Sequence, residues 1–449
     1  MSNDSSVTVG VLGLHNSKET KAICNAVEAL GHDPAWLRRE NTVVEVDDGE
    51  ATLEPDVDIV VNRMLLSKST EPSEELGLAR TVSTLRPTLN EPSATLTAMH
   101  KMASAVALSA DGIAVPDALL ALASDRLNHR LAEAGTDTVY KTAIGTNGGG
   151  TWKVHPGDQV NARVGNRHAF LQSLIERGDD ELARDLRVYV VGDDVAGAMF
   201  RYAPENDWRT NVALGGAVAD AAGEVPEAVL DTARRATEVV GLDYAGVDLV
   251  EGTDGWYVLE VNPTAGFKGL YAATGTSPAP SIARLAIERA GGSVDPDRVA
   301  DLAATLDDSP PSCTPTELPT NPREPQSIGY IEEVVVSGTS GSKKTFAKSD
   351  TGAKRSSIDT NLAAEVGAGP IRSVTKIRSG SQKASKSRPV VDLVVAIGGT
   401  RHTVTASVED RGHMQYPLLL GRDILQHYQV DVRKRADALA DTTTESDEE

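Results

Sequence analysis

The sequence predicts an α/β multidomain protein with an all-β domain toward its C-terminal end, and three observations support this prediction. From residue 7 onward, apolar strand-like segments alternate with amphipathic helix-like segments, which is typical of a parallel α/β domain. A segment rich in Pro, Ser, Thr and Asp begins near residue 294. Beyond it, short β-rich runs separated by Gly turns indicate an all-β domain.

Length and charge narrow the class of protein. At 449 residues the chain is too long for one ordinary core, so several domains are expected. The net charge of −21 is spread along the sequence, which argues against binding of DNA or an anionic membrane. An anionic ligand must therefore meet locally clustered Lys, Arg or metal. With only 4% aromatic residues, this acidity resembles that of halophilic proteins, so we expect an adaptation to high salt.

Cysteine usage and hydropathy predict a cytoplasmic protein. Cys24 and Cys313 are far apart in the sequence and lack zinc-ligand spacing, so neither a disulfide framework nor a thiolate zinc site is expected. The first residues are polar, and no stretch approaches the roughly 20 apolar residues of a membrane span.

The first domain is expected to be a small parallel α/β domain over residues 1–94. Its strands are predicted at 7–13 and 57–61, with a helix at 18–30 between them. No Gly-x-Gly-x-x-Gly follows the first strand, so dinucleotide binding there is unsupported.

Changes in hydrophobic periodicity and composition also divide the rest of the chain into domains. A second domain should open with a helix that starts near residue 95 and carries Lys101, followed by a strand at 113–115. The predicted ranges are 95–291 for this mixed α and β domain, 292–327 for a linker, 328–435 for a β-barrel and 436–449 for an acidic disordered tail.

Residues 244–262 predict a β-hairpin that carries a metal site. The turn signal is centred on Asp254. Residues two apart on a strand share a face, which places Glu260 beside Asn262, and the turn position places Asp248 opposite Glu260. Two carboxylates and an amide oxygen are hard ligands of the kind that Mg²⁺ or Mn²⁺ prefers. A solvent-facing polar edge is the alternative, but acids beside apolar neighbours are costly without a partner.

A phosphate chain also needs positive charge and backbone donors. Lys141 lies at the end of a predicted strand and precedes a glycine-rich loop at 145–150, in which Gly148 and Gly149 can turn N–H groups toward phosphate oxygens. A glycine cluster alone is a weak signal, because a hairpin tip would look the same. Its value comes from the lysine before it and the acidic hairpin after it.

Clustered arginines form a third group. The strand that carries Asp185 and Arg187 is followed by Arg201, Arg209 and Asn211. In so acidic a chain this grouping favours capture of an anionic substrate. Surface ion pairing is about equally plausible for any single arginine.

From about residue 7 to 288 these motifs, in this order, resemble the RimK-type α-L-glutamate ligases of the ATP-grasp superfamily. The resemblance implies an ATP-grasp domain that binds ATP and two Mg²⁺ or Mn²⁺ ions. It also implies roles for individual residues: Lys101, Lys141, Gly148 and Gly149 at the phosphates; Gln172, Ser173 and Leu174 at the adenine hinge; Asp185 at the nucleotide or its ribose; Arg209, Thr210 and Asn211 on the phosphate and substrate side; Arg201 at a substrate carboxylate; and Asp248, Glu260 and Asn262 at the metals. Ser173 replaces the usual hinge Glu, and residues 177–181 look like an insertion, so the hinge can shift by a few positions.

The chemistry implied is an ADP-forming carboxylate–amine ligation. An acceptor carboxylate would attack the γ-phosphate of ATP to give an acylphosphate, which the amino group of L-glutamate or a related amino acid would then attack. The acceptor would be a protein C-terminus or a small coenzyme that already carries glutamate. We also expect a homo-oligomer.

The C-terminal segment resembles retropepsin-like aspartic proteases, and also a family labelled ATP-dependent zinc proteases. The resemblance rests on the Asp350-Thr-Gly motif and on the run from Tyr416 to Leu425. Asp350 would be the peptidase acid, paired with a second copy in a dimer. Residues 346–349 are more polar than a strand that delivers a catalytic acid, and no Cys/His cluster supports zinc. A non-catalytic barrel is therefore favoured, with a peptidase or an ATP-regulated acceptor-binding protein as the alternative functions.

Overall fold

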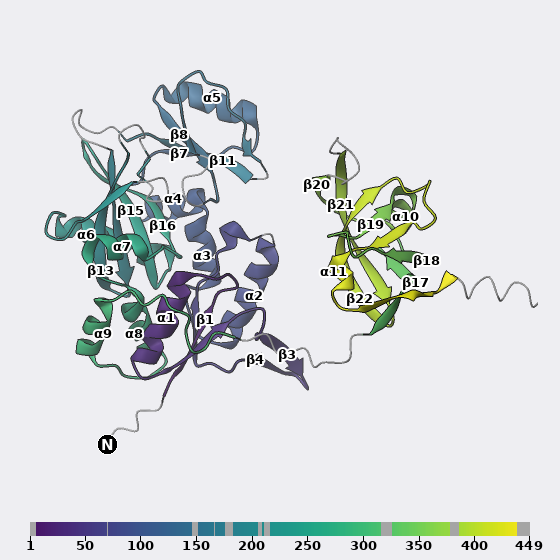
Figure 1. The fold of residues 1–449 in the computed structure, drawn as a ribbon. Coiled ribbons are helices and arrows are strands. Elements are labelled where there is room, and N and C mark those ends of the chain that lie inside the picture. Colours follow the sequence, from purple (N-terminus) through teal and green to yellow (C-terminus); the bar gives the residue numbers. More distant parts are fainter. Residues whose placement is uncertain are drawn as a thin grey trace, which may run out of the picture. The chain divides into compact units, whose positions relative to one another are not determined.

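The computed structural model describes residues 6–69, 71–145, 151–165, 167–175, 183–204, 209–210, 216–315, 326–377 and 386–437. The chain divides into two compact units, residues 1–317 and 318–449 (Figure 1). In the described residues, no helix combines the length and the apolar composition that a membrane crossing requires.

The first unit opens with the predicted parallel sheet, which is confirmed. β1 (Thr8–Leu12) lies between β2 (Asp33–Leu37) and β5 (Ile59–Asn62), and β6 (Thr88–Leu89) extends the sheet beyond β5. α1 (Lys18–Ala29) begins where the side chain of Ser17 accepts a hydrogen bond from the backbone N–H of Thr20, as an N-cap residue does. The hairpin β3 (Val43–Asp47) and β4 (Glu50–Glu54) was not predicted.

The predicted helix through Lys101 is in fact two helices. α3 (Pro92–Met99) ends and α4 (Lys101–Ala110) begins at His100, whose extended backbone breaks the helix and whose side chain accepts from the backbone N–H of Ala103. Lys101 is therefore the first residue of a helix. The prediction of a strand at 113–115 is wrong. The strand that follows α4 is β7 (Ala118–Leu119).

A small antiparallel lobe follows. Its sheet has the order β10-β11-β8-β9 with β7 paired to β11, and α5 packs on it through Leu127 and Leu131 (Figure 1). The bounds are α5 (Ser124–Ala134), β8 (Thr138–Thr142), β9 (Thr151–Val154), β10 (Arg163–Val164) and β11 (Arg167–Ser173).

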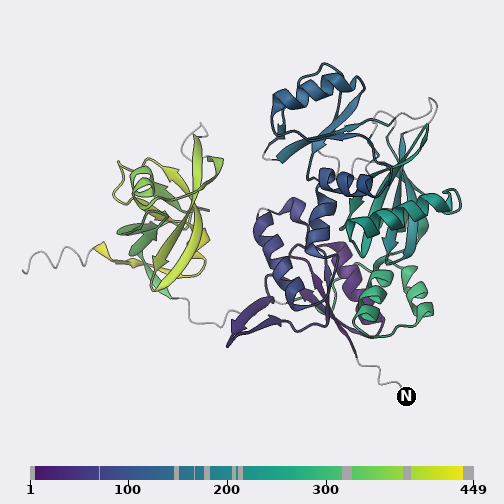
Figure 2. The same ribbon diagram turned by 180° about the vertical axis from the view of Figure 1, so that it is seen from behind.

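The largest sheet of the first unit has the order β14-β13-β12-β15-β16. On one face Leu186 and Val188 pack with α6 (Glu227–Val240), while Tyr189 and Val191 belong to a core shared with α1 and α8 (Ala279–Arg289). Figures 1 and 2 show α1 and α8 side by side, although they are far apart in the sequence. The remaining bounds are β12 (Arg184–Val191), β13 (Asp194–Tyr202), β14 (Ala217–Asp220), β15 (Tyr244–Gly252), β16 (Gly255–Asn262) and α7 (Lys268–Thr274).

The side chain of Asn90 connects the N-terminal sheet to the strands of the largest sheet through hydrogen bonds. Asn90 is fully buried with a φ of 57°. Its side-chain N–H groups donate to the carbonyls of Tyr244 (2.9 Å) and Pro263 (3.3 Å), and its side-chain oxygen accepts from the backbone N–H of Asp243 (2.8 Å). Tyr244 starts β15, and Pro263 follows the end of β16. One side chain therefore fixes both ends of the hairpin that was predicted to bind metal.

We expect Asn90→Ala to lower the free energy of unfolding of the first unit by at least about 3 kcal/mol, because several buried backbone groups lose their partners. Asn90→Gly should cost about 1 kcal/mol less than Ala, since glycine adopts a positive φ without strain. All four tryptophans lie in the first unit, so denaturation followed by tryptophan fluorescence reports on it alone. A loss of unfolding free energy below 1 kcal/mol for Asn90→Ala would contradict this structural role of Asn90.

The prediction of a linker over 292–327 is wrong for its first part, which is folded. Residues 296–303 form α9 (Pro296–Ala303), capped by Asp295, and the carbonyl of Ala303 accepts a hydrogen bond from Ser277 (2.8 Å). Cys313 packs against the core that contains Cys24, and both thiols are free. The composition of this segment did not reveal its packing, because its few apolar side chains join a core supplied by other segments. Residues 316–325 and most of the predicted acidic tail lie outside the described residues.

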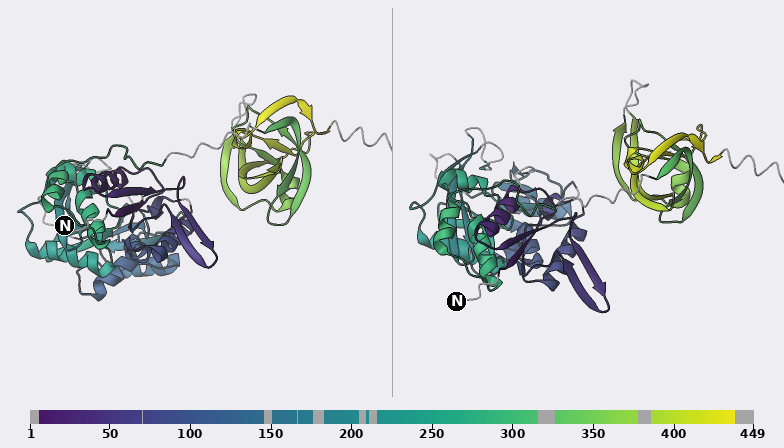
Figure 3. Two further views of the ribbon diagram at one scale, coloured as in Figure 1. Left: turned by 90° about the horizontal axis from the view of Figure 1, so that it is seen from below. Right: turned by 60° about the horizontal axis from the view of Figure 1, so that its bottom comes forward.

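The second unit confirms the predicted all-β barrel. A pairing between β17 (Ser327–Ser337) and β21 (Lys386–Ile397) closes a ring of six strands in the described part of the chain, in the order β17-β21-β22-β19-β23-β18 (Figure 3). The other bounds are β18 (Ser342–Ser349), β19 (Ser357–Asp359), α10 (Thr360–Val366), β20 (Ile371–Ile377), β22 (Thr400–Glu409), β23 (Leu418–Leu420), α11 (Arg422–Leu425) and β24 (Gln429–Arg435).

Candidate nucleotide and metal site

The β15–β16 hairpin has the register that the sequence predicts. Asp248 pairs directly with Glu260, and Gly246 pairs with Asn262. A β-bulge at Leu259 shifts the alternation, so Val258 and Val261 both enter the core beneath α6. Glu260 and Asn262 therefore lie on the same face of the sheet as Asp248. This face is opposite to the one on which Val258 and Val261 are buried.

Four charged residues pair across neighbouring strands on this face. Arg187 of β12 lies opposite Asp248 of β15, and Asp185 of β12 lies opposite Arg201 of β13. The Nε and Nη2 of Arg187 donate to the two oxygens of Asp248 at 2.6 and 2.7 Å. Arg201 donates to both oxygens of Asp185 at 2.6 and 2.7 Å and also contacts Asp248 at 3.0 Å. The result is a continuous network of buried ion pairs.

This network fixes the charge state of Asp248. Burial alone would raise the pKa of the Asp248 carboxyl, but Arg187 and then Arg201 outweigh burial and lower it to about 2. The pKa of Arg187 is raised, because the attraction of Asp248 exceeds the cost of burial. Asp248 is therefore an anion at any physiological pH.

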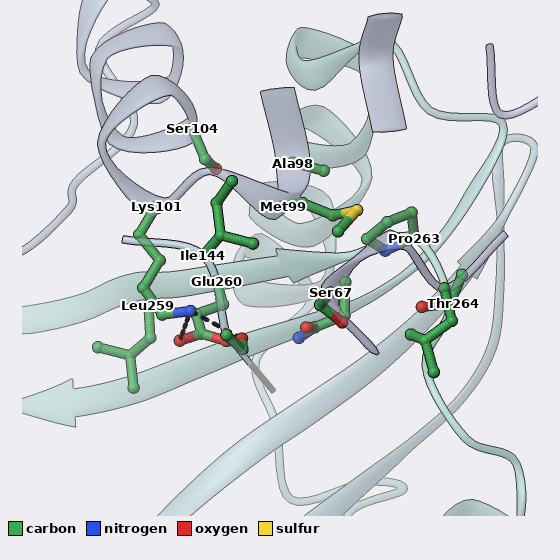
Figure 4. A pocket seen from close by; sticks show the side chains of 13 residues that line it. Ser67, Ala98, Met99, Lys101, Ser104, Ile144, Leu259, Glu260, Pro263 and Thr264 are labelled. Atoms are coloured by element: carbon green, nitrogen blue, oxygen red, sulfur yellow. Dashed lines mark hydrogen bonds and ion pairs between the residues drawn. The ribbon is translucent and has the colours of Figure 1, made fainter. Parts of the chain in front are cut away.

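Two lysines from different elements converge on Glu260. The Nζ of Lys101, at the start of α4, lies 3.3 Å from Oε1 of Glu260, and the Nζ of Lys141, on β8, lies 3.4 Å from the same oxygen. Figure 4 shows Lys101 and Glu260 turned toward each other, with a contact drawn between them. The structure thus brings together the lysines and the acidic hairpin, which are more than a hundred residues apart in the sequence.

The two lysines and Glu260 also set one another's charge. Burial lowers the pKa of Lys141 from its ordinary value, and the attraction of Glu260 only partly offsets this. Burial would raise the pKa of Glu260, but Lys101 and Lys141 outweigh it and hold that pKa below its ordinary value. The described site thus holds four cations against three carboxylates, a local positive excess in a chain of net charge −21.

A pocket opens beside Lys101 and Glu260. Figure 4 shows its lining, which comes from α3 and α4, from the end of β16, and from the segment that carries Ser67. Ile144, which follows β8, also lines it, and Arg167 of β11 holds the Ser67 and Ile144 segments together by donating to the carbonyls of Ser67 (2.6 Å) and Ile144 (2.5 Å). The cavity is therefore enclosed by the N-terminal sheet region, the small lobe and the largest sheet.

The other predicted site residues fall into three groups. Gln172, predicted at the hinge, is buried on β11 and accepts a hydrogen bond from Lys141 at 2.9 Å; Ser173 follows it on the same strand, and Leu174 comes directly after. Thr210 donates its hydroxyl to Asp185, next to Arg209. Asn211, Gly148 and Gly149 lie outside the described residues. The roles assigned to all these residues stay predictions.

The hairpin ligands fit a divalent cation bound to a nucleotide. Oδ1 of Asp248 receives only the bond from Arg187 among the described residues, so a lone pair remains on it. Asn262 donates its amide N–H to Asp248 at 3.3 Å, so its carbonyl oxygen can serve a cation. The described residues contain no group of three or more His, Cys, Asp or Glu that could hold a metal alone. Phosphate oxygens and water would therefore have to complete the shell, as is usual for Mg²⁺.

The sequence assigned no individual role to Arg187 within the arginine group, and it did not point to Arg167 or Ser67. The strand period could have placed Arg187 on the face of Asp185, because the two are two residues apart. For Arg167 and Ser67 no local signal exists, since their contact joins segments a hundred residues apart.

Comparisons with known proteins identify similar domains in both units. The RimK-like ATP-grasp domain family matches residues 98–285, and the retropepsin-like aspartic endopeptidase RimB family matches residues 359–438. Similar relatives are the tetrahydromethanopterin:α-L-glutamate ligase of Methanocaldococcus jannaschii (31% identical over 41% of this chain) and the ribosomal protein bS6–L-glutamate ligase of Escherichia fergusonii (31% over 44%). The chain covers 64% and 66% of the length of these relatives.

One similar solved structure is the ATP-grasp ligase PsnB complexed with a phosphomimetic variant of its minimal precursor, Mg and ADP. It is 22% identical and covers 63% of this chain and 98% of its own, with a TM-score of 0.49. The chain therefore carries a RimK-like ATP-grasp domain in its first unit and a RimB-like retropepsin-like domain in its second.

Proposed function

We propose that this chain is an ATP-dependent ligase that joins L-glutamate, or a related amino acid, to an acceptor carboxylate. The observation that carries the proposal is the convergence of Lys101 and Lys141 on Glu260, which lies opposite Asp248 and beside Asn262. Cations and hard oxygen ligands at one cavity are what a nucleotide with its metal requires.

In the first step, an acceptor carboxylate oxygen would attack the γ-phosphorus of ATP, and the bond to the β-phosphate oxygen would break to release ADP. Lys101 and Lys141 would hold phosphate oxygens and balance their charge. Two Mg²⁺ or Mn²⁺ ions held by Asp248, Glu260 and Asn262 would supply further positive charge when bound.

In the second step, the amino group of glutamate would attack the acyl carbon, lose a proton and expel phosphate. No side chain has to form a covalent bond, so positioning and electrostatics would account for the rate. The ion-pair network would keep rigid the face of the sheet that carries the proposed metal ligands. In this network, formed by Arg187, Arg201, Asp185 and Asp248, each carboxylate is held by more than one bond.

The acceptor is proposed to be a protein C-terminus or a small coenzyme, because the names of the relatives include ribosomal protein bS6 and tetrahydromethanopterin. Purified protein given ATP, Mg²⁺ and glutamate should release phosphate only when a glutamate-terminated acceptor is supplied. The product should gain the mass of glutamate less water. Phosphate release that no acceptor stimulates would contradict the proposal.

The barrel offers a second candidate, an aspartic-type peptidase, because it carries the Asp350-Thr-Gly motif. Asp350 follows the end of β18, and its Oδ1 accepts from the backbone N–H of Gly352 (2.9 Å) and Ala353 (3.2 Å). The RimB family match begins at residue 359, after this motif. Aspartic proteolysis needs two carboxylates that share a proton, so a second copy of the chain would have to supply the partner.

Asp350→Ala separates the two candidates. We expect phosphate release and glutamate transfer to stay within about twofold of the wild type, because Asp350 lies in the other unit from the lysines and the hairpin. A peptidase assay on the same preparations should show no cleavage that depends on Asp350. Cleavage lost in the variant while ligation persists would assign a second activity to the barrel.

A further inference from the structure

Arg63 is a buried cation whose hydrogen-bonding capacity the chain leaves largely unused. It follows β5 directly and is 3% exposed. Its Nε and Nη1 have no hydrogen-bond partner, and no carboxylate of the described residues pairs with it. Its guanidinium carbon lies 5.3 Å from the centroid of the Phe267 ring, and its charge acts on the phenol of Tyr244. A buried charge held this way is costly, so its presence calls for a ligand.

Arg63 lines a hollow at the carboxyl end of the N-terminal sheet. In open α/β sheets this edge is where ligands usually bind. Tyr189, Gly246 and Phe267 are among the residues that line this hollow. Asn262 lines both this hollow and the cavity that contains Lys101 and Glu260. A group bound at Arg63 would thus share a lining residue, Asn262, with the proposed phosphate site.

We propose that Arg63 binds a substrate carboxylate that stays intact during ligation. The inference rests on the ligase proposed above and adds a substrate subsite to it. The phosphates already have Lys101 and Lys141, whereas Arg201, the residue expected to bind a substrate carboxylate, is engaged by Asp185 and Asp248. Arg63 is a cation of this region that lacks an anionic partner among the described residues. A carboxylate would supply the acceptors that its Nε and Nη1 lack.

The carboxylate can come from the incoming amino acid or from a glutamate-terminated acceptor, and titration calorimetry separates the two. The full chain, with Mg²⁺ and a non-hydrolysable ATP analogue, is titrated with L-glutamate and, separately, with N-acetyl-glutamyl-glutamate. Arg63→Met should weaken binding of one of these probes by at least about tenfold, the usual effect of losing a charge-assisted bond. Arg63→Lys should retain part of the affinity. L-glutamine and the α-amide of glutamate then identify which carboxylate of the probe is bound.

A structural role for Arg63 makes a different prediction. If Arg63 binds a ligand, Arg63→Met leaves the affinity for the ATP analogue within twofold and does not lower the melting temperature of the ligand-free protein, because a poorly partnered buried charge is removed. Arg86→Met is the matched control, since Arg86 pairs at the surface with Asp56 at 2.7 Å; it should change neither probe's affinity.

The inference is overturned if Arg63→Met binds both probes as the wild type does, if neither probe binds the wild type, or if the variant loses melting temperature and nucleotide affinity together. The ligase proposal fails on a different measurement, namely if no acceptor stimulates phosphate release by the wild type.

Discussion

Glu260→Ala is expected to lower acceptor-dependent phosphate release by about 10³-fold, because it removes a proposed metal ligand and the counter-ion of two lysines at once. Without Glu260, Lys101 and Lys141 lose their shared partner, to which both now lie within 3.4 Å. The lysines then repel each other, and the proposed cation site would lose one of its three hairpin ligands. Steady-state phosphate release at saturating ATP and Mg²⁺ measures the effect.

Glu251→Ala is the matched control for this experiment. Glu251 lies on the same hairpin, is exposed, and pairs weakly with Arg184 at 3.5 Å. Its replacement should change turnover by less than twofold. Glu260→Gln keeps the size of the side chain and should be nearly as inactive as Ala, which would assign the loss to charge. Full turnover by Glu260→Ala would refute the proposed role of the hairpin.

The hairpin was predictable because its information is local. A turn signal fixes the register, and the register fixes which side chains share a face. That is why Asp248 and Glu260 pair as predicted. The bulge at Leu259 was not predictable, since no Gly or Pro marks it, yet it lets Val258 and Val261 enter one core while Glu260 faces the site.

The parts that depend on distant segments could not be predicted. Nothing near Arg63 in the sequence shows that Phe267 and Tyr244 surround it, and nothing near Asp185 shows that Arg201 lies directly opposite it on the next strand. The predicted linker failed for the same reason, because α9 packs against α8 and the flanking Val294 and Leu306 join a core that other segments supply. Composition describes what a segment can bury by itself and omits what its neighbours offer.

Asp248→Asn is expected to destabilise the first unit by about 3–5 kcal/mol, the usual cost of removing one partner from a buried ion-pair network. Arg187 would lose both of its bonds to Asp248, and Arg201 would keep only Asp185. Asp194→Asn is the matched control, because Asp194 pairs with Arg284 at 2.8 Å on the surface and should cost less than 1 kcal/mol. Equal costs in tryptophan-monitored denaturation would show that the network contributes no more than a surface pair.

The pH dependence of the same measurement isolates the carboxylate. The folded pKa of Asp248 is about 2, below its ordinary value of 3.8, so the unfolded chain binds the proton more readily than the folded one. The stability that Asp248 contributes should therefore be complete above pH 3.8 and lost as the pH falls toward 2, a total on the order of 2 kcal/mol. Other acids also titrate in this range, so the informative quantity is the difference between the wild type and Asp248→Asn. That difference should shrink as the pH falls, because protonation of Asp248 removes the charge that the substitution removes. A difference that stays constant from pH 5 to 2.5 would mean that Arg187 and Arg201 do not stabilise the ionised carboxylate, and the electrostatic basis of the proposed ligand face would fail with it.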